Sequence, residues 1–142
     1  MNLLEARSLS HVYQGGVQAL SGINLTVKRG VRLAIVGANG AGKTTLLLHL
    51  NGILRPSNGA MFLDGCPVAY GAAYLAAWRK RVGLVLQDAD DQLFAATVAE
   101  DVSFGPLNIG LSEVQTQSRV FDALQIMGIS NLADRSTHML SF

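Results

Sequence analysis

Two stretches near the start of the chain, residues 3–13 and 23–27, alternate apolar and polar side chains. This period of two places the apolar side chains on one face and is typical of half-buried strands. Glycines between the two stretches supply a turn, so the pattern predicts an antiparallel pair. Residues 31–36 and 82–87 are rich in apolar side chains without that alternation, which indicates strands covered on both faces.

Helical patterns occupy most of the remaining chain. Residues 43–52 predict a helix that stops at Gly52, a residue type that often ends helices in the left-handed conformation. A short strand at 61–63, turned by Asp64 and Gly65, follows it. Further helices are expected at 72–81, at about 97–104, at 112–127 and at 131–135, with a break at 105–110. This order indicates an α/β chain that becomes helical toward its end.

Composition narrows the class of protein. The 142 residues fit one domain, and a net charge of +1 with 15% charged residues gives no electrostatic support for a nucleic-acid partner. The sequence contains no uninterrupted apolar run near 18 residues and no pattern of a signal peptide. Cys66 is the one cysteine, so it has no internal disulfide partner, in agreement with a cytosolic site.

The stretch "GANGAGKTT" carries the clearest chemical signal. Gly37, Gly42, Lys43 and Thr44 satisfy the spacing G-x-x-x-x-G-K-[ST] between a predicted strand and a predicted helix, which is the context this phosphate-binding loop requires. Glycines let backbone N–H groups approach phosphate oxygens, and the helix directs its positive end at the same anion. Lys43 would reach the β- and γ-phosphates, and the Thr44 hydroxyl would bind Mg²⁺. An incidental glycine-rich turn is the less favoured interpretation.

The loop alone leaves kinases, GTPases, helicases and transport ATPases open. Taken with "SHVYQGG", "VGLVLQDADDQLFAATVAEDVSFGPLNIGL" and "HMLSF", it resembles the ATP-binding subunit of ABC transporters from about residue 8 onward, and most of all the ATPase of energy-coupling-factor importers for cobalt or nickel. The resemblance implies an incomplete P-loop NTPase (ABC ATPase) fold: antiparallel N-terminal strands, part of a parallel core sheet and the start of a helical subdomain. It implies one partial domain over 1–142, with a nucleotide-binding core to about 87, a Q-loop and helical subdomain over 88–135, and the start of a signature motif at 138–142.

The resemblance also implies roles for single residues. Tyr13 stands where the family stacks an aromatic ring on adenine, although a lone tyrosine at a strand end is more often a core or interface residue. Gln87 stands where a glutamine contacts Mg²⁺ and the attacking water and couples to the membrane partner. Ser141 stands in the signature that touches the γ-phosphate held by the opposite subunit. The residues expected to bind ATP in the loop are Gly37, Asn39, Gly40, Ala41, Gly42, Lys43, Thr44 and Thr45.

The implied function is an ATPase at the cytoplasmic face of the membrane, bound there as a peripheral subunit. It would pair with a second ATPase subunit, identical or paralogous, and with a transmembrane coupling protein and a substrate-binding membrane protein. ATP binding and hydrolysis would drive uptake of cobalt or nickel, with a vitamin as an alternative cargo. Two other hypotheses stay open: a soluble P-loop ATPase of DNA repair or translation, and a non-catalytic nucleotide-binding remnant.

Several elements of a complete ATPase have no counterpart in the sequence. No apolar run ending in Asp-Glu follows the helices, so the general base is missing, and we expect the chain to be the N-terminal part of a longer enzyme and inactive alone. The resemblance implies that the missing strands lie between 31–36 and 82–87, so we expect unpaired strand edges and a chain that is poorly soluble or only partly folded. Asp88, Asp90 and Asp91 could bind a metal, but a solvated, membrane-facing loop is the favoured interpretation. The histidines show no metal-ligand spacing.

Overall fold

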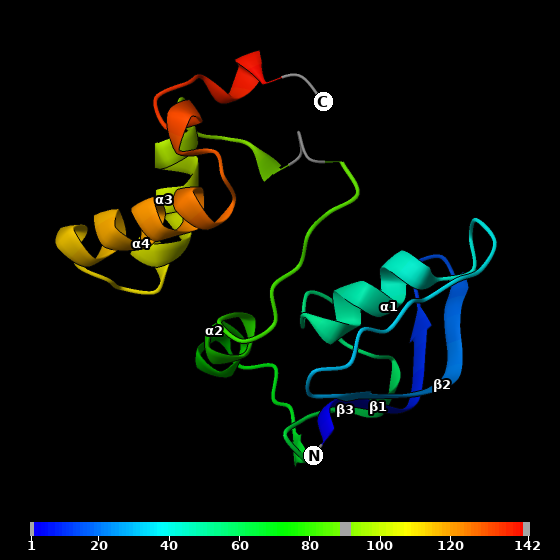
Figure 1. Ribbon diagram of the computed structural model, residues 1–142. Coiled ribbons are helices and arrows are strands. Elements are labelled where there is room, and N and C mark those ends of the chain that lie inside the picture. Colours follow the sequence, from blue (N-terminus) through cyan, green and yellow to red (C-terminus); the bar gives the residue numbers. More distant parts are fainter. Residues whose placement is uncertain (1, 89–91, 141–142) are drawn as a thin grey trace. The chain divides into compact units, whose positions relative to one another are not determined.

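The computed structural model describes residues 2–88 and 92–140. Ser141, Asp90 and Asp91, which the sequence singled out, therefore lie outside the described residues. The chain forms two compact units, Met1–Leu84 and Val85–Phe142, and each is described by itself (Figure 1). No helix within the described ranges is both long enough and apolar enough to cross a membrane.

The first unit is built on a four-stranded sheet of order β2-β1-β3-β4. Its strands are β1 (Asn2–Val12), β2 (Gln18–Lys28), β3 (Asn58–Leu63) and β4 (Cys66–Pro67). All three pairings are antiparallel, which confirms the predicted β1–β2 pair. Because side chains alternate along each strand, one face of the sheet collects the apolar ones.

Helix α1 (Lys43–Leu50) covers that apolar face, as Figure 1 shows. Leu46 of α1 packs into the core with residues of β1, β2 and β3, and burial of each leucine contributes about 1.5–3 kcal/mol. The hairpin between β1 and β2 closes where the N–H of Tyr13 donates to Val17 O at 2.9 Å. The core side chains of the strands are Leu4, Ala6, Leu9, Leu20, Met61 and Leu63.

The C-terminal end of α1 is set by the conformation of Gly52, by a backbone hydrogen bond and by packing against Trp78. Gly52 has φ +74, as its predicted left-handed role requires, and Ile53 N–H donates to Leu48 O at 2.9 Å in the motif that ends many helices. A side chain at position 52 would meet the Trp78 ring at 2.8 Å, so this packing also demands glycine. Trp78 belongs to α2 (Ala72–Arg79), which ends two residues before the predicted limit of 81.

The two predicted inner strands are not formed. Residues 31–36 and 82–87 have no strand partner within the described part of the chain, and all described strand pairs are antiparallel. A strand needs a neighbour that satisfies its backbone N–H and C=O groups, and apolar sequence alone does not supply one. Val36 is accordingly 89% exposed and Val85 84% exposed. The described residues therefore form no parallel strand pair.

The second unit is helical. Helices α3 (Val98–Asn108) and α4 (Glu113–Ile126) pack side by side, followed by short 3₁₀ turns at Ser130–Leu132 and Thr137–Met139. Each long helix begins with a capping box, which satisfies its first N–H groups. The predicted helix at 131–135 is wrong, since only the first of those 3₁₀ turns overlaps it.

The predicted break at 105–110 comes too early. Pro106 lies inside α3, and the helix continues to Asn108 before the chain turns. Proline removes one N–H from the helix, but Ile109 N–H still donates to Gly105 O at 3.2 Å. A single lost bond in the last turn therefore does not end the helix at Pro106.

Candidate nucleotide-binding site

The glycine-rich loop occupies residues 37–42 and leads directly into α1. Gly42 is the residue before the helix and has φ +85, a conformation that L side chains rarely adopt. A Cβ at this position would lie 2.4 Å from the carbonyl oxygen of Ala19 in β2. Backbone conformation and contact with the sheet thus both require glycine here, and they fix the start of α1 against β2.

Lys43 reaches back over the loop from the first position of α1. Its Nζ donates to the carbonyl oxygens of Gly37 at 2.8 Å and Ala38 at 2.7 Å. Three donors on one ammonium group allow this pair of bonds and one further acceptor. The loop therefore carries a positive charge held on its own backbone, beside the N-terminus of the helix.

The N-terminus of α1 is left free for an anion. No side chain caps it and no acidic residue lies in its first turn, whereas α3 and α4 both carry capping boxes and acidic first-turn residues. The first N–H groups of a helix have no intrahelical acceptor, and the helix dipole adds positive potential there. Together with Lys43, this end of α1 fits the triphosphate of a nucleotide. Thr44, exposed in the same turn, offers a hydroxyl oxygen suited to Mg²⁺.

Tyr13, the predicted base-stacking residue, lies immediately after β1 and contacts the same helix. Its hydroxyl forms a hydrogen bond of 3.0 Å with the Thr45 hydroxyl, while the residue stays 39% exposed. Thr45 itself is buried on the third position of α1. The structure thus brings together two residues that the sequence analysis selected separately, one for adenine and one for phosphate.

Two histidines beneath this contact were missed as functional candidates. The His11 ring on β1 packs edge-on against Tyr13 at 4.6 Å between centroids and against His49 of α1 at 4.7 Å. His49 is fully buried, and its Nδ1 lies 2.7 Å from Thr45 O. Burial lowers the pKa of His49, so the ring is neutral, with its proton on the Nδ1 that faces the carbonyl. Sequence spacing carried no signal for this pair.

Gln87 and Ser141 are the remaining predicted site residues. Gln87 belongs to the second compact unit, in a segment where Leu86 N–H donates to Gln92 Oε1 at 2.9 Å. Ser141 lies outside the described residues. Within the described ranges, no group of three or more His, Cys, Asp or Glu side chains is arranged to hold a metal ion. The roles given to Gln87 and Ser141 therefore stay predictions.

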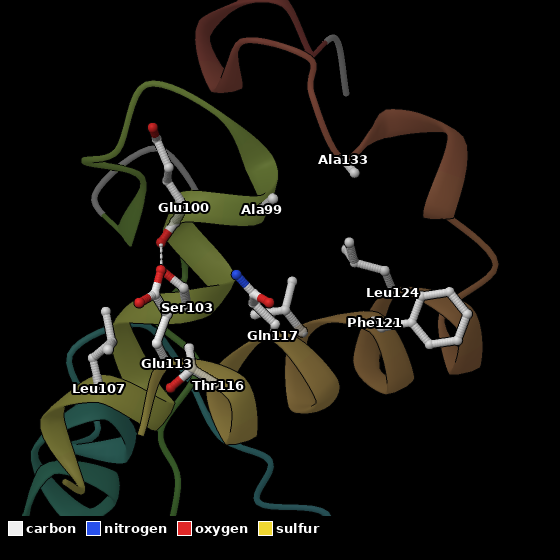
Figure 2. A pocket seen from close by; sticks show the side chains of 11 residues that line it. Ala99, Glu100, Ser103, Leu107, Glu113, Thr116, Gln117, Phe121, Leu124 and Ala133 are labelled. Carbon is white, nitrogen blue, oxygen red and sulfur yellow. Dashed lines mark hydrogen bonds between the residues drawn. The ribbon is translucent and has the colours of Figure 1, made fainter. Parts of the chain in front are cut away.

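A hollow of about 500 Å³ opens in the second unit between α3 and α4 (Figure 2). Leu107, Phe121 and Leu124 give it an apolar lining, with Glu100 and Glu113 among the polar residues. All the residues that line this hollow belong to the second unit.

Comparison with solved structures identifies the class of fold. The chain is similar to CbiO1 of Clostridium perfringens, described as part of the ABC transporter complex CbiONQ, with a TM-score of 0.87 and 45% identity. This match covers 99% of the chain and 56% of CbiO1. The fold is that of the ABC ATPases, a class of P-loop NTPases.

Sequence comparison gives the family. A family model described as "ABC transporter" matches residues 20–142, and the chain belongs to that family. It is 59% identical over 139 residues to the cobalt import ATP-binding protein CbiO of Rhodobacter capsulatus. This match covers 98% of the chain and 50% of the relative. It is 50% identical to the energy-coupling factor transporter ATP-binding protein EcfA of Methanothermobacter thermautotrophicus, covering 98% of the chain and 45% of that relative. The chain thus spans about half the length of these curated relatives.

Proposed function

We propose that the protein carrying this sequence is the ATP-binding and ATP-hydrolysing subunit of an energy-coupling-factor importer for cobalt or nickel ions. The observation that carries the proposal is the loop at 37–45: an uncapped helix N-terminus with the Lys43 ammonium folded over it. This arrangement suits a triphosphate, and the relatives named above support the transport context.

Each residue of the site has a defined task in this proposal. Backbone N–H groups at the start of α1 hold the β- and γ-phosphates, and the Lys43 ammonium, which already lies beside the loop, donates to phosphate oxygens. Thr44 and Gln87 hold the Mg²⁺ that neutralises charge on the phosphates when it is bound. Tyr13 supports the adenine ring by stacking. Gln87 orients the attacking water and reports the presence of the γ-phosphate to the membrane partner.

The proposal includes partners on two sides. Ser141 contributes to the nucleotide site of a second ATPase subunit, so the working unit is a dimer. The membrane partner docks on the second unit, where exposed Phe94 and Phe104 rings lie 4.4 Å apart between centroids. Two neighbouring exposed aromatic rings supply apolar surface that a partner could cover. The subunit thereby sits as a peripheral protein on the cytoplasmic face of the membrane.

An uptake assay tests the proposal. The full-length protein, reconstituted with its membrane partners in vesicles, is expected to accumulate radioactive Co²⁺ or Ni²⁺ only when ATP and Mg²⁺ are supplied on the side of the ATPase. The variant Lys43→Ala should show no uptake above the level without ATP. Uptake by Lys43→Ala at the normal rate would refute the assignment, and uptake of a vitamin in place of either metal would correct the cargo.

A further inference from the structure

Four residues of the first unit form a closed ring of contacts, through their side chains and the main-chain carbonyl of Thr45. Tyr13 bonds through its hydroxyl to the Thr45 hydroxyl at 3.0 Å, and its ring packs edge-on against His11. His11 packs in turn against His49, whose Nδ1–H donates to the Thr45 carbonyl oxygen at 2.7 Å. The ring links the end of β1 to α1, so the position of Tyr13 is coupled to the helix that carries the phosphate loop.

The two histidines have no other evident task in the described structure. His49 is 0% exposed and His11 is 8% exposed, so neither can touch a nucleotide at the surface. His11 Nδ1 is buried without a hydrogen-bond partner among the described residues. A buried polar atom without a partner lowers the stability of the folded state, and an apolar side chain carries no such penalty. Packing this part of the core with histidines therefore stabilises the folded state less than apolar side chains would.

We propose that Thr45, His11 and His49 are positioning residues that hold the Tyr13 ring at a fixed place and angle for the nucleotide base. The inference rests on the function proposed above, in which Tyr13 stacks on adenine. Stacking alone needs only a flat aromatic face, and phenylalanine provides one as well as tyrosine. In the structure, the Tyr13 hydroxyl is instead hydrogen-bonded to the Thr45 side chain. The main-chain carbonyl of the same Thr45 accepts the hydrogen bond from His49.

The variant Tyr13→Phe distinguishes a Tyr13 that acts only as a flat aromatic face from a Tyr13 whose hydroxyl bond to Thr45 also matters. It keeps the aromatic ring and removes only the hydroxyl bond to Thr45, at a position that is 39% exposed. We expect the full-length protein with this substitution to bind MgATP about five-fold more weakly, the equivalent of one neutral hydrogen bond. Its affinity for inorganic tripolyphosphate with Mg²⁺, measured by competition with a fluorescent ATP analogue, should stay unchanged because that ligand has no base. Unchanged ATP affinity would overturn the proposal.

A matched pair of variants at position 49 tests the part that buried His49 plays in this ring of contacts. His49→Leu removes the donor to the Thr45 carbonyl, whereas His49→Asn places an amide N–H near the place of Nδ1–H. We expect His49→Leu to weaken ATP binding several-fold without changing tripolyphosphate binding, and His49→Asn to recover most of the loss. Equal loss for both ligands would mean that His49 only stabilises the loop, which contradicts the proposal.

The same titrations keep this inference distinct from the function on which it rests. If the unsubstituted protein binds neither MgATP nor tripolyphosphate saturably, the proposed function fails. If it binds both and Tyr13→Phe binds ATP equally well, only the positioning role fails. Should a position-49 variant fail to fold, as judged by circular dichroism, the Tyr13→Phe result decides alone.

Discussion

The Nζ of Lys43 lies 2.7 Å from the carbonyl oxygen of Ala38, so the lysine connects the start of α1 to the beginning of the glycine-rich loop. A second bond to Gly37 holds it there, although the residue is only half-buried. The charge is thereby kept next to the free N–H groups of α1. Phosphate oxygens that enter the loop meet a cation that is already in position, which reduces the entropy lost on binding.

This arrangement predicts a large effect of Lys43→Ala on nucleotide affinity. Hydrogen bonds to charged groups contribute about 1.5–3 kcal/mol, so the dissociation constant for MgATP should rise about 10- to 100-fold. Isothermal titration calorimetry on the full-length protein measures the change. Lys28→Ala is the matched control, because Lys28 is an exposed lysine at the end of β2 and should have no effect. Comparable losses for both variants would point to a general charge effect and not to the loop.

Gly42→Ala should destabilise the first unit through two separable causes. The residue must adopt φ +85, and its new Cβ would lie 2.4 Å from Ala19 O. Gly65→Ala serves as the control, because Gly65 has φ +78 with nothing within 4 Å of a Cβ. Left-handed strain costs about 1–2 kcal/mol in both variants, and the clash adds to it at position 42 only. Thermal melts should therefore rank Gly42→Ala clearly below Gly65→Ala, and equal melting temperatures would refute the contact with β2.

His49 predicts a pH dependence of stability. Burial lowers its pKa in the folded state below the ordinary value of 6.5, so the unfolded chain takes up this proton first as the pH falls. The contribution of His49 to the free energy of unfolding is therefore complete above pH 6.5. It declines as the pH falls below 6.5, until the pKa of His49 in the folded state is reached. Urea unfolding between pH 8 and pH 5 should show this decline in the unsubstituted protein. His49→Asn should flatten it, and an unchanged slope would contradict a buried neutral His49.

Phe104 predicts how the second unit contacts the membrane partner. It is 50% exposed and packs edge-on against Phe94, itself 60% exposed. Phe104→Ser should reduce co-purification of the full-length protein with its transmembrane partner, with little loss of ATP binding. Ile126→Ser is the control, since Ile126 is an apolar residue at the end of α4 that is 83% exposed and does not belong to the Phe94–Phe104 pair. Loss of the partner in the control alone would place the docking surface elsewhere.

The local features of the first unit were largely predictable from the sequence. Alternation predicted β1 and β2, and the motif spacing predicted both the loop and the start of α1 at Lys43. These signals are short-range, since glycine conformations and strand periodicity act within a few residues. The left-handed Gly52 at the end of α1 is a further case, because its role follows from the helix alone.

Other features depend on partners distant in the chain and could not be predicted in this way. Residues 31–36 have a strand-like sequence, yet no described strand pairs with them. The contact between Tyr13 and Thr45 depends on how β1 lies against α1, and the His11–His49 pair is hidden for the same reason. Each of these relationships is set by tertiary packing, which single-sequence patterns do not encode.

The central claim is that backbone N–H groups at the start of α1 bind a nucleotide triphosphate, and amide chemical shifts test it most directly. In a titration of the ¹⁵N-labelled full-length protein with MgATP, we expect saturable shifts concentrated on the amide signals of residues 40–45. At the MgATP concentration that saturates the unsubstituted protein, the shifts in Lys43→Ala should be much smaller, because its affinity is lower. Saturation without shifts at these amides, or no saturable binding at all, would contradict the claim.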